Sequence, residues 1–407
     1  MLSIVAELAI AIFMTMNNNG PMKTFDSIQI LRPELATSYL ALLTAQPGRP
    51  IALFAPRRVG KTYFLDGDLS PAAEKAGFLP VYADLWLNRT APLDAINQAL
   101  EEALDDVNVP HSVLGRMVKT PVRKVGVLGA SLGLGRTPTR RDLPDKPELR
   151  MDTLIARLAN DAGKPVLLML DEIQALAHSA GGDAVIASIR AVLQKHKKKV
   201  FAVFTGSSQE ALGEMMMSAG GPMYQFAQLL TFPFLEIEFL ERLAAHFSEV
   251  HPRKRLDVVA LQRVFEHIGF KPALMKDIVK EMSAEGQTDV RLALEKFMKD
   301  DRNVPAWQGV FDALQPLEQA VLVILAHGIA PMGKDTIMAL STIPAVNATL
   351  AKVRAALDRM RKAGILCNPP KVGYMIEDRL FRDYLATTYQ PNYITNGKIG
   401  TLRRIQE

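Results

Sequence analysis

The feature that most constrains the fold is the segment Ala-Pro-Arg-Arg-Val-Gly-Lys-Thr at residues 55–62. It matches the phosphate-loop pattern G-x-x-x-x-G-K-[ST], with alanine in place of the first glycine. The pattern is meaningful only between a strand and a helix, because loop N–H groups and the helix N-terminus bind the anion together. The apolar run 51–54 and the apolar residues from Tyr63 onward supply that context. The segment therefore predicts a nucleotide-binding α/β domain; the alternative is a chance match in a surface loop.

Three residues of this loop have a defined chemical task. Gly60 lets the backbone approach the phosphates, Lys61 neutralises phosphate charge, and the Thr62 hydroxyl binds Mg²⁺. Ala55 costs stability if its position needs a positive φ, but the chemistry requires no side chain there. We predict ATP or ADP with Mg²⁺ as the ligand. The residues predicted to contact it are Ala55, Pro56, Arg57, Arg58, Val59, Gly60, Lys61, Thr62 and Tyr63.

A second signal is the acidic pair Asp171-Glu172, which directly follows the apolar run 166–170. Open α/β sheets bind ligands at the carboxyl ends of their strands. We predict that Asp171 holds Mg²⁺ together with Thr62, and that Glu172 is the general base that polarises the attacking water. Lys61, which neutralises phosphate charge, is a second predicted catalytic residue. A solvated strand end is the alternative.

A third strand, 200–204, ends in Thr205-Gly206-Ser207-Ser208 and should lie between the phosphate-loop strand and the acidic strand. A hydroxyl at its tip can orient the attacking water or sense the γ-phosphate. We predict Ser207 as this catalytic residue, with Ser208 next. The alternative is a helix N-cap for residues 208–216.

Apolar runs alternate with helical patterns up to residue 238, which predicts a doubly wound parallel sheet. The predicted strands are 51–54, 79–84, 165–170, 200–204 and, more weakly, 232–237; the predicted helices are 92–106, 150–162, 182–197 and 208–216. Residues 119–150 interrupt this order as a glycine-rich, basic insertion, which either touches a partner or nucleic acid or is a surface hairpin.

From residue 239 the pattern is helical. Helices are predicted at 239–250, 256–268, 272–284 and 288–300, a break at Pro305, helices at 314–327, 333–341 and 347–363, a two-stranded piece at 364–376 and a last helix at 378–388. Three helices followed by a hairpin is the order of a winged helix-turn-helix. The predicted domains are an N-terminal extension (1–24), a core (25–238), a helical domain (239–304), a winged helix (313–390) and an irregular tail (391–407).

The basic excess of the chain is local. Residues 313–407 hold 12 Lys or Arg and 7 Asp or Glu, whereas residues 1–312 hold 36 of each. In a winged helix the third helix enters the DNA major groove. The predicted contacts to duplex DNA are Lys352, Arg354, Arg359, Arg361, Lys362 and, on the wing, Lys371. The alternative is a protein-docking module with solvated basic residues.

Composition excludes several classes of protein. Hydrophobic residues make up 48% and charged residues 22% of the 407 residues, which excludes a mainly disordered chain. A lone cysteine, Cys367, excludes an intramolecular disulfide and a cysteine-based zinc site. The apolar stretch 2–13 is shorter than the roughly 20 residues of a membrane-spanning helix. We expect a soluble cytoplasmic protein with no membrane partner.

Together, APRRVGKT, LMLDEIQAL and FTGSS resemble the motifs of bacterial and archaeal AAA+ ATP-binding proteins close to the STAND and origin-recognition-type ATPases. Residues 268–272 resemble the GG-N-P signature that opens a lid helix, and residues 375–385 resemble the close of that group's winged helix. The resemblance covers about residues 25–390 and makes 239–304 the lid.

The resemblance implies a homo-oligomer with the nucleotide at a subunit interface, where a neighbour donates an arginine finger. Arg190 is the candidate catalytic finger and Arg58 a second basic group, although Arg190 also reads as an ordinary helix-surface arginine. The lid lacks the second-sensor arginine of many AAA+ proteins; Lys271 or Lys276 are the candidates to replace it. This favours slow hydrolysis.

Two functions fit these patterns. The first is a Mg-dependent AAA+ ATPase that uses ATP to control assembly and engages duplex DNA through its winged helix. The alternative is a STAND-like nucleotide switch whose winged helix docks a protein partner. A non-catalytic adaptor is disfavoured because Lys61, Thr62, Asp171 and Glu172 are all intact.

Overall fold

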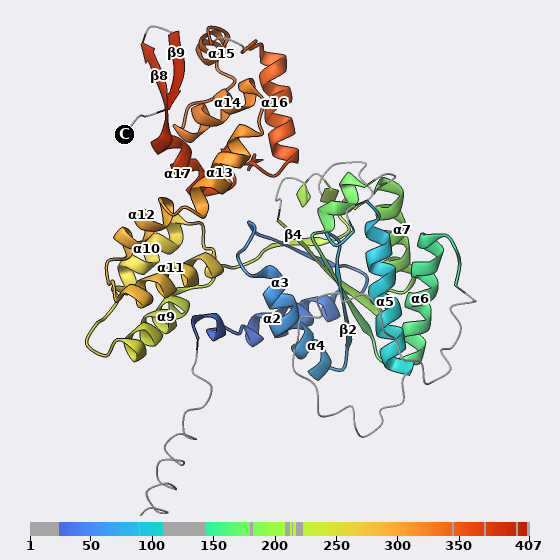
Figure 1. Ribbon diagram of the computed structural model, residues 1–407. Coiled ribbons are helices and arrows are strands. Elements are labelled where there is room, and N and C mark those ends of the chain that lie inside the picture. The colour runs from blue at the N-terminus through green and yellow to red at the C-terminus, as the bar shows by residue number, and fades with distance from the viewer. Residues whose placement is uncertain are drawn as a thin grey trace, which may run out of the picture. The chain divides into compact units, whose positions relative to one another are not determined.

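The computed structural model describes residues 24–88, 90–108, 143–179, 182–207, 212–213, 215–216, 223–343, 346–369, 372–395 and 398–404. The chain divides into two compact units (Figure 1). One is Leu31–Pro233, and the other joins Met1–Ile30 to Phe234–Glu407. The apolar stretch 2–13, residues 119–142 of the predicted insertion, and Ser208 and Lys371 lie outside the described residues. No helix in the described ranges is both long and apolar enough to cross a bilayer.

The first unit contains a five-stranded sheet in the order β2-β3-β4-β1-β5, and the strand pairs are all parallel. The strands are β1 (Ile51–Phe54), β2 (Leu79–Asp84), β3 (Val166–Asp171), β4 (Val200–Gly206) and β5 (Gln228–Thr231). All six residues of β3 are buried, as expected for a strand covered on both faces. The predicted place of the third strand, between the phosphate-loop strand and the acidic strand, is confirmed.

The position predicted for the weakest strand is wrong. β5 occupies Gln228–Thr231, not 232–237. Phe232 still donates its N–H to the Phe54 carbonyl, but β1 ends at Phe54, so the ladder has no further strand residue to pair with. Residues from Ile237 then begin the next helix.

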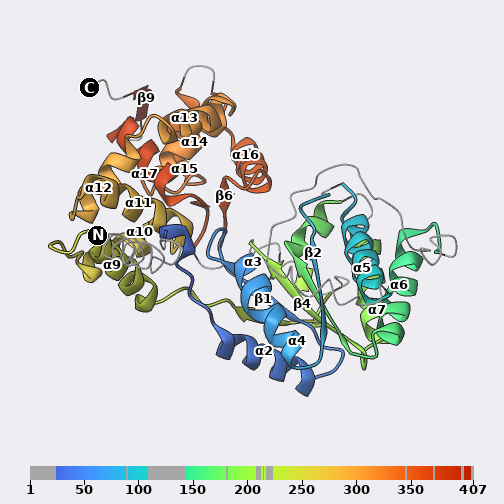
Figure 2. The same ribbon diagram turned by 60° about the horizontal axis from the view of Figure 1, so that its bottom comes forward.

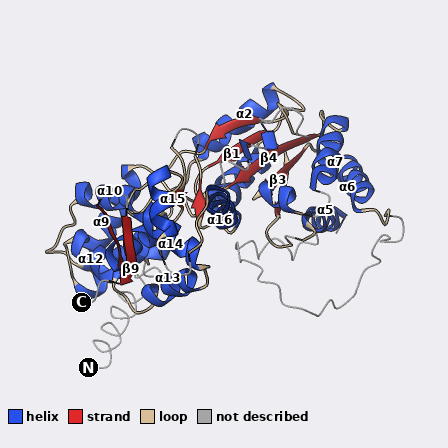
Figure 3. Ribbon diagram, turned by 90° about the horizontal axis from the view of Figure 1, so that it is seen from above, coloured by secondary structure: helices blue, strands red, loops and turns tan. Residues whose placement is uncertain are grey.

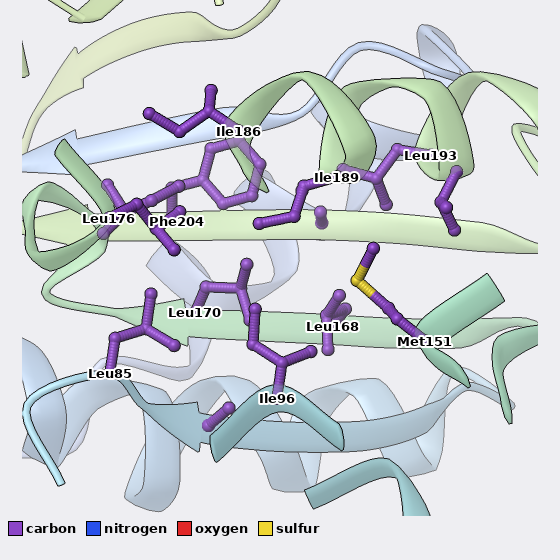
Figure 4. Packing of buried hydrophobic residues seen from close by; sticks show 14 of the residues in the cluster. Leu85, Ile96, Met151, Leu168, Leu170, Leu176, Ile186, Ile189, Leu193 and Phe204 are labelled. Atoms are coloured by element: carbon purple, nitrogen blue, oxygen red, sulfur yellow. The ribbon is translucent and has the colours of Figure 1, made fainter. Parts of the chain in front are cut away.

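Helices cover both faces of this sheet. One layer contains α2 (Pro33–Ala45), α3 (Lys61–Phe64) and α4 (Ser70–Lys75), and the other contains α5 (Pro92–Asn108), α6 (Pro147–Asp161) and α7 (Gly182–Lys195) (Figures 2 and 3). Figure 4 shows Ile96, Met151 and Ile189 from the second layer packed on Leu168 and Leu170 of β3. The doubly wound parallel α/β fold class is therefore confirmed.

The second unit is mainly helical. Its elements are α9 (Ile237–Val250), α10 (Val258–His267), α11 (Pro272–Glu285), α12 (Val290–Met298), α13 (Asn303–Asp312), α14 (Pro316–Ala326), α15 (Lys334–Ser341), α16 (Leu350–Lys362), β6 (Leu366–Cys367), β7 (Met375–Ile376), α17 (Arg379–Thr388), β8 (Tyr389–Thr395) and β9 (Lys398–Arg404). The helices α9 to α12 enclose one apolar core, and α14 to α17 with β6 and β7 contribute to a second.

Two local predictions for this unit are wrong. Pro305 does not interrupt the helical structure, because it lies in the first turn of α13. The N–H groups of a first turn have no acceptor within the helix, so proline loses no hydrogen bond there. The tail expected to be irregular forms the antiparallel pair β8 and β9. The register of this pair shifts twice along its length. The alternation of apolar and polar residues by which a strand is predicted from sequence is therefore weak in this segment.

Candidate nucleotide-binding site

The loop between β1 and α3 has the backbone of an anion-binding turn. Arg58 (φ 65°) and Gly60 (φ 95°) both adopt left-handed conformations, and Gly60 caps α3. Alternation of this kind turns successive N–H groups toward one side of the loop. Ala55 is not among the described residues with a positive φ, so the stability cost considered for alanine at this position does not arise.

The Lys61 side chain is folded into the loop. The residue is 5% exposed, and its Nζ donates hydrogen bonds to the carbonyls of Ala55 at 2.7 Å and Pro56 at 3.0 Å. A buried ammonium is costly unless acceptors surround it. These contacts hold the cation beneath the turn that presents the loop N–H groups, which gives the turn the positive charge that a phosphate requires.

Asp171 lies at the centre of a hydrogen-bond network at the carboxyl ends of the strands. It is 2% exposed. Its Oδ2 accepts hydrogen bonds from Thr62 Oγ1 at 2.6 Å and from the Tyr82 hydroxyl at 3.0 Å. Its Oδ1 accepts from the Thr205 hydroxyl. Burial and the neighbouring Asp171 charge raise the pKa of Tyr82, so the phenol stays a donor to this carboxylate.

Glu172 is held by a group that we call the glutamate clamp: Glu172, Gln174 and Ser207. Glu172 Oε2 accepts from the Ser207 hydroxyl at 2.7 Å, from the Ser207 N–H at 3.3 Å and from the Gln174 amide. Gln174 Nε2 also donates to Ser207 Oγ at 3.0 Å. Glu172 itself has a left-handed backbone (φ 57°), so the extended backbone of β3 ends at Asp171 and the chain turns at Glu172.

The phosphate loop contacts this clamp through Arg57. Its Nε donates to Ser207 Oγ at 3.2 Å, and its guanidinium lies 4.3 Å from the centroid of the Trp86 ring. Direct hydrogen bonds thus bring four of the predicted residues together at one edge of the sheet: Thr62, Asp171, Glu172 and Ser207. Lys61, next to Thr62 in sequence, bonds carbonyls of its own loop.

Sequence reasoning missed three residues of this network, Tyr82, Thr205 and Gln174. It also missed Asp84, which lies beside the network. Asp84 ends β2 directly opposite Asp171 in the register. Burial, the main cause, and the charges of Asp171 and Glu172 raise the pKa of Asp84. The available signal was that polar residues at the ends of neighbouring parallel strands must meet at the same sheet edge.

The oxygen donors present fit Mg²⁺. A Thr hydroxyl and one carboxylate form a small set of hard ligands, and Mg²⁺ is typically held by one or two carboxylates together with substrate phosphates and water. Within the described ranges no cluster of three His, Cys, Asp or Glu side chains could hold a metal alone. A cation bound by Thr62 and Asp171 would therefore take its remaining ligands from the phosphates of a nucleotide and from water.

The predicted arginine finger contacts its own chain. Arg190 on α7 places its guanidinium 5.2 Å from the centroid of the Phe226 ring, and Nη1 donates to the Tyr224 carbonyl at 3.5 Å. Arg58 in the phosphate loop is exposed.

The two candidate lid lysines also have partners. Lys271 Nζ lies 3.2 Å from Asp378 Oδ1, and Lys276 Nζ donates to the Asp26 carbonyl at 3.4 Å. Burial lowers the pKa of Lys276.

The basic residues of α16 fall into two groups. Lys352, Arg354 and Lys362 are exposed. Arg359 donates to Glu318 at 2.8 Å, where the Glu318 side chain is 8% exposed, and Arg361 lies 3.9 Å from Asp358. Arg359 and Arg361 therefore have intramolecular partners that compete with any ligand.

No protein-family model and no curated protein matches this chain, but solved structures do. A Walker-type ATPase of Pyrococcus abyssi has a TM-score of 0.56 at 16% identity, covering 90% of this chain and 99% of its own. The ORC2 protein of Aeropyrum pernix has a TM-score of 0.49 at 16% identity, covering 86% and 90%. The ORC1 protein of the same organism, solved in complex with DNA, has a TM-score of 0.43 at 14% identity, covering 88% and 93%. Together with the strand order and the loop geometry, the Pyrococcus likeness shows that this chain has a P-loop α/β fold of the AAA+ type.

Proposed function

We propose that the protein is a Mg-dependent ATPase of the AAA+ type. The observation that carries the proposal is that the phosphate loop is linked to both acidic residues. Thr62 bonds Asp171 directly, and Arg57 donates to Ser207, which in turn donates to Glu172. The Pyrococcus protein with the same fold is described as a Walker-type ATPase, which supports this choice.

The residues divide the work of phosphoanhydride hydrolysis. Loop N–H groups and Lys61 bind the β- and γ-phosphates. Thr62 and Asp171 hold Mg²⁺, which when bound supplies charge neutralisation at the phosphate oxygens. Glu172 accepts a proton from the attacking water. Ser207 and Gln174 set the orientation of the Glu172 carboxylate, because both donate to its Oε2.

Assembly is the second part of the proposal. ATP binding controls a homo-oligomer with the nucleotide at a subunit interface, where a neighbour donates Arg190 as the finger. Arg58 of the phosphate loop meets the nucleotide or the neighbour. Arg58 is exposed on the phosphate loop, and Arg190 must leave Phe226 and the Tyr224 carbonyl to act in this way. That exchange favours slow turnover.

Duplex DNA is the proposed partner of the C-terminal module. Helices α14, α15 and α16 followed by β6 and β7 have the element order of a winged helix. Three exposed basic residues of α16 form no ion pair among the described residues, so phosphate contacts are assigned to them first: Lys352, Arg354 and Lys362. The excess of basic residues after position 313 supports an anionic partner.

A STAND-like switch is the second candidate, and contacts inside the second unit favour it. Besides the Lys271–Asp378 ion pair, His267 Nε2 lies 2.7 Å from Asp383 Oδ2, and Arg379 donates to the Glu266 carbonyl at 2.7 Å. These contacts tie α10 and the start of α11 to α17. A nucleotide-driven movement of the helical domain would then move α17 as well, and a docked protein partner would respond.

ATPase rate with and without a short duplex, at about 50 mM and about 200 mM salt, separates the two candidates. Salt-sensitive stimulation by the duplex supports the DNA-engaging ATPase. If the duplex neither changes the ATPase rate at either salt concentration nor binds to the protein, the STAND-like switch is the function that remains. Lys61→Ala should lose nucleotide binding; if Lys61→Ala binds ATP as the natural chain does, the site itself is misassigned. Light scattering with and without ATP reports the assembly.

A further inference from the structure

A second basic surface lies on the first unit, at the edge of the sheet where the strands begin. Residues 195–199 read Lys-His-Lys-Lys-Lys, and no acidic residue occurs between Asp183 and Glu210. This run connects α7 to β4. Lys195, Lys197, Lys198 and Lys199 are all exposed.

Parallel strands bring two more cations to the same edge. Arg49 precedes β1 and Lys164 precedes β3, the two strands that flank β4, and both residues are exposed. The loops contact one another directly. The Val166 N–H donates to the Lys199 carbonyl at 2.8 Å, and Gln194 Nε2 donates to the Gly48 carbonyl at 3.1 Å.

We call these six residues the entry-edge patch: Arg49, Lys164, Lys195, Lys197, Lys198 and Lys199. Across the part of the chain that the structure describes, one member has an ion pair, that of Lys195 with Asp152 at 2.6 Å. The three segments 46–50, 160–165 and 195–199 together contain one acidic residue, Asp161. The patch therefore concentrates positive charge, and within the described residues the ion pair of Lys195 is the only one that offsets it.

The patch is remote from the proposed nucleotide site. β4 is seven residues long, which separates the two edges of the sheet by about 20 Å. Figure 4 shows the two ends: Leu193, close to the patch in sequence, lies at one end of the strands and Leu176, close to Glu172, at the other. A ligand of the patch is therefore not the bound nucleotide.

The chemistry of the patch selects its partner. Protein interfaces draw their energy from apolar and aromatic anchors and are depleted in lysine. The three segments contribute none of the exposed large hydrophobic residues in the described ranges. Single-stranded nucleic acid is held by aromatic stacking, which these segments also lack. Contacts with a duplex phosphate backbone need only basic groups, and adjacent strands about 5 Å apart spread these groups over several phosphates.

We propose that the entry-edge patch binds the phosphate backbone of duplex nucleic acid without reading sequence. This goes beyond the DNA contact proposed for α16, because the patch belongs to the other compact unit. The chain then holds a duplex through two separate basic surfaces.

The test compares the full-length chain with Lys197→Gln/Lys198→Gln, measuring affinity for a short random-sequence duplex over a series of salt concentrations. Each lost phosphate contact makes the slope of log affinity against log salt concentration less negative by about 0.9. The slope of the double variant should therefore be less negative than that of the natural chain by about 1–2. Lys280→Gln/Lys299→Gln removes the same charge from exposed lysines of the helical domain and should keep the natural slope. Nucleotide affinity should be unchanged in both.

The outcomes separate this proposal from the proposed function. Lys352→Gln/Arg354→Gln tests the α16 contact alone. If this variant binds the duplex as tightly as the natural chain does, the proposed α16 contact is wrong, and the proposal for the entry-edge patch is unaffected. Two results overturn the proposal that the patch binds a duplex. One is that Lys197→Gln/Lys198→Gln and Arg49→Gln/Lys164→Gln both keep the natural chain's slope of log affinity against log salt; the other is that the natural chain binds no duplex. A patch variant that loses binding to a polyglutamate peptide but keeps its duplex affinity makes the partner an acidic protein and also overturns it.

Discussion

Thr62 Oγ1 donates a 2.6 Å hydrogen bond to Asp171 Oδ2, joining the first turn after the phosphate loop to the end of β3 across 109 residues of sequence. The two side chains are the hard oxygen donors that a Mg–nucleotide complex would meet. Tyr82 and Thr205 complete the surroundings of the carboxylate. The position of Asp171 is therefore fixed before any ligand binds.

The first prediction concerns this pair. Thr62→Ala should weaken ATP binding about 10-fold or more in Mg²⁺ and much less in EDTA, because the hydroxyl acts through the cation. Calorimetry in both buffers measures the difference. Thr44→Ala is the matched control, since the Thr44 hydroxyl bonds the Leu40 and Ala41 carbonyls of its own helix. Equal weakening in both buffers would contradict the role of Thr62.

The second prediction concerns the base. Glu172→Gln should keep ATP affinity and lose about 10²- to 10⁴-fold in turnover, because the amide cannot accept the proton from water. Glu74→Gln, an exposed residue of α4, is the control. Single-turnover hydrolysis measures the step. Turnover within a few-fold of the natural chain would remove Glu172 from the mechanism.

The third prediction concerns the glutamate clamp. Ser207→Ala removes the 2.7 Å hydrogen bond to Glu172 and the acceptor for Arg57. Turnover should fall about 10-fold or more, with ATP affinity changing little, because the base loses its orientation while the phosphate contacts remain. Ser188→Ala, whose hydroxyl bonds the Ala184 carbonyl on an exposed helix surface, is the control. A change confined to ATP affinity would assign Ser207 to ground-state binding instead.

The fourth prediction concerns Arg32, whose guanidinium lies 5.2 Å and 4.4 Å from the ring centroids of Phe64 and Phe232. The Arg32 N–H donates to Asp68 Oδ1 at 2.5 Å, and Asp68 is 5% exposed. Burial lowers the pKa of Arg32 and raises that of Asp68, and each charge partly offsets the other.

Arg32→Ala keeps the backbone N–H bond to Asp68 but removes the guanidinium charge that favours the buried, ionised carboxylate. Losing one charge of a fully buried ion pair costs about 3–5 kcal/mol; because Arg32 is partly exposed and acts on Asp68 through its charge alone, we expect about 1–2 kcal/mol in urea unfolding. Arg32→Ala/Asp68→Asn should recover part of this loss. Arg49→Ala, an exposed arginine bonded to Gln46, is the control. No difference between the single and double variants would mean that Asp68 tolerates its charge alone.

The fifth prediction is a pH dependence. Burial disfavours the Asp152 charge, but hydrogen bonds from Lys195 and His196 outweigh it and lower the pKa of Asp152 below its ordinary 3.8. A lowered pKa in the folded state stabilises the fold above the ordinary value, and the effect is lost as the pH falls through the folded pKa.

Asp152→Asn should therefore reduce the free energy of unfolding by about 0.5–1 kcal/mol at neutral pH, where the pair is partly exposed. The difference from the natural chain should shrink below about pH 3.8. Urea titrations from neutral to acid pH follow it, with Asp161→Asn, exposed on α6, as the control. A difference that grows in acid would reverse the sign and refute the pairing.

Local sequence determined the elements that carry the chemistry. The strands Ile51–Phe54 and Leu79–Asp84 have the predicted bounds, because a short apolar run between turn residues has few other ways to bury itself. The phosphate loop needs only its own backbone and the following helix, so its residues are readable within ten positions of sequence. The order of motifs along the chain similarly predicted which strand lies between the other two.

Tertiary structure decided which side chains meet. Tyr82 and Thr205 lie on strands far from Asp171 in sequence, and hydrogen bonds across a sheet depend on register that no local pattern specifies. Arg359 reads as a surface cation on α16, yet it bonds Glu318 of α14. The patch cations Arg49 and Lys164 are 115 positions apart and share one edge only because their strands run parallel on either side of β4. Sequence thus supplied the chemical groups, and the strand order of the sheet supplied their neighbours.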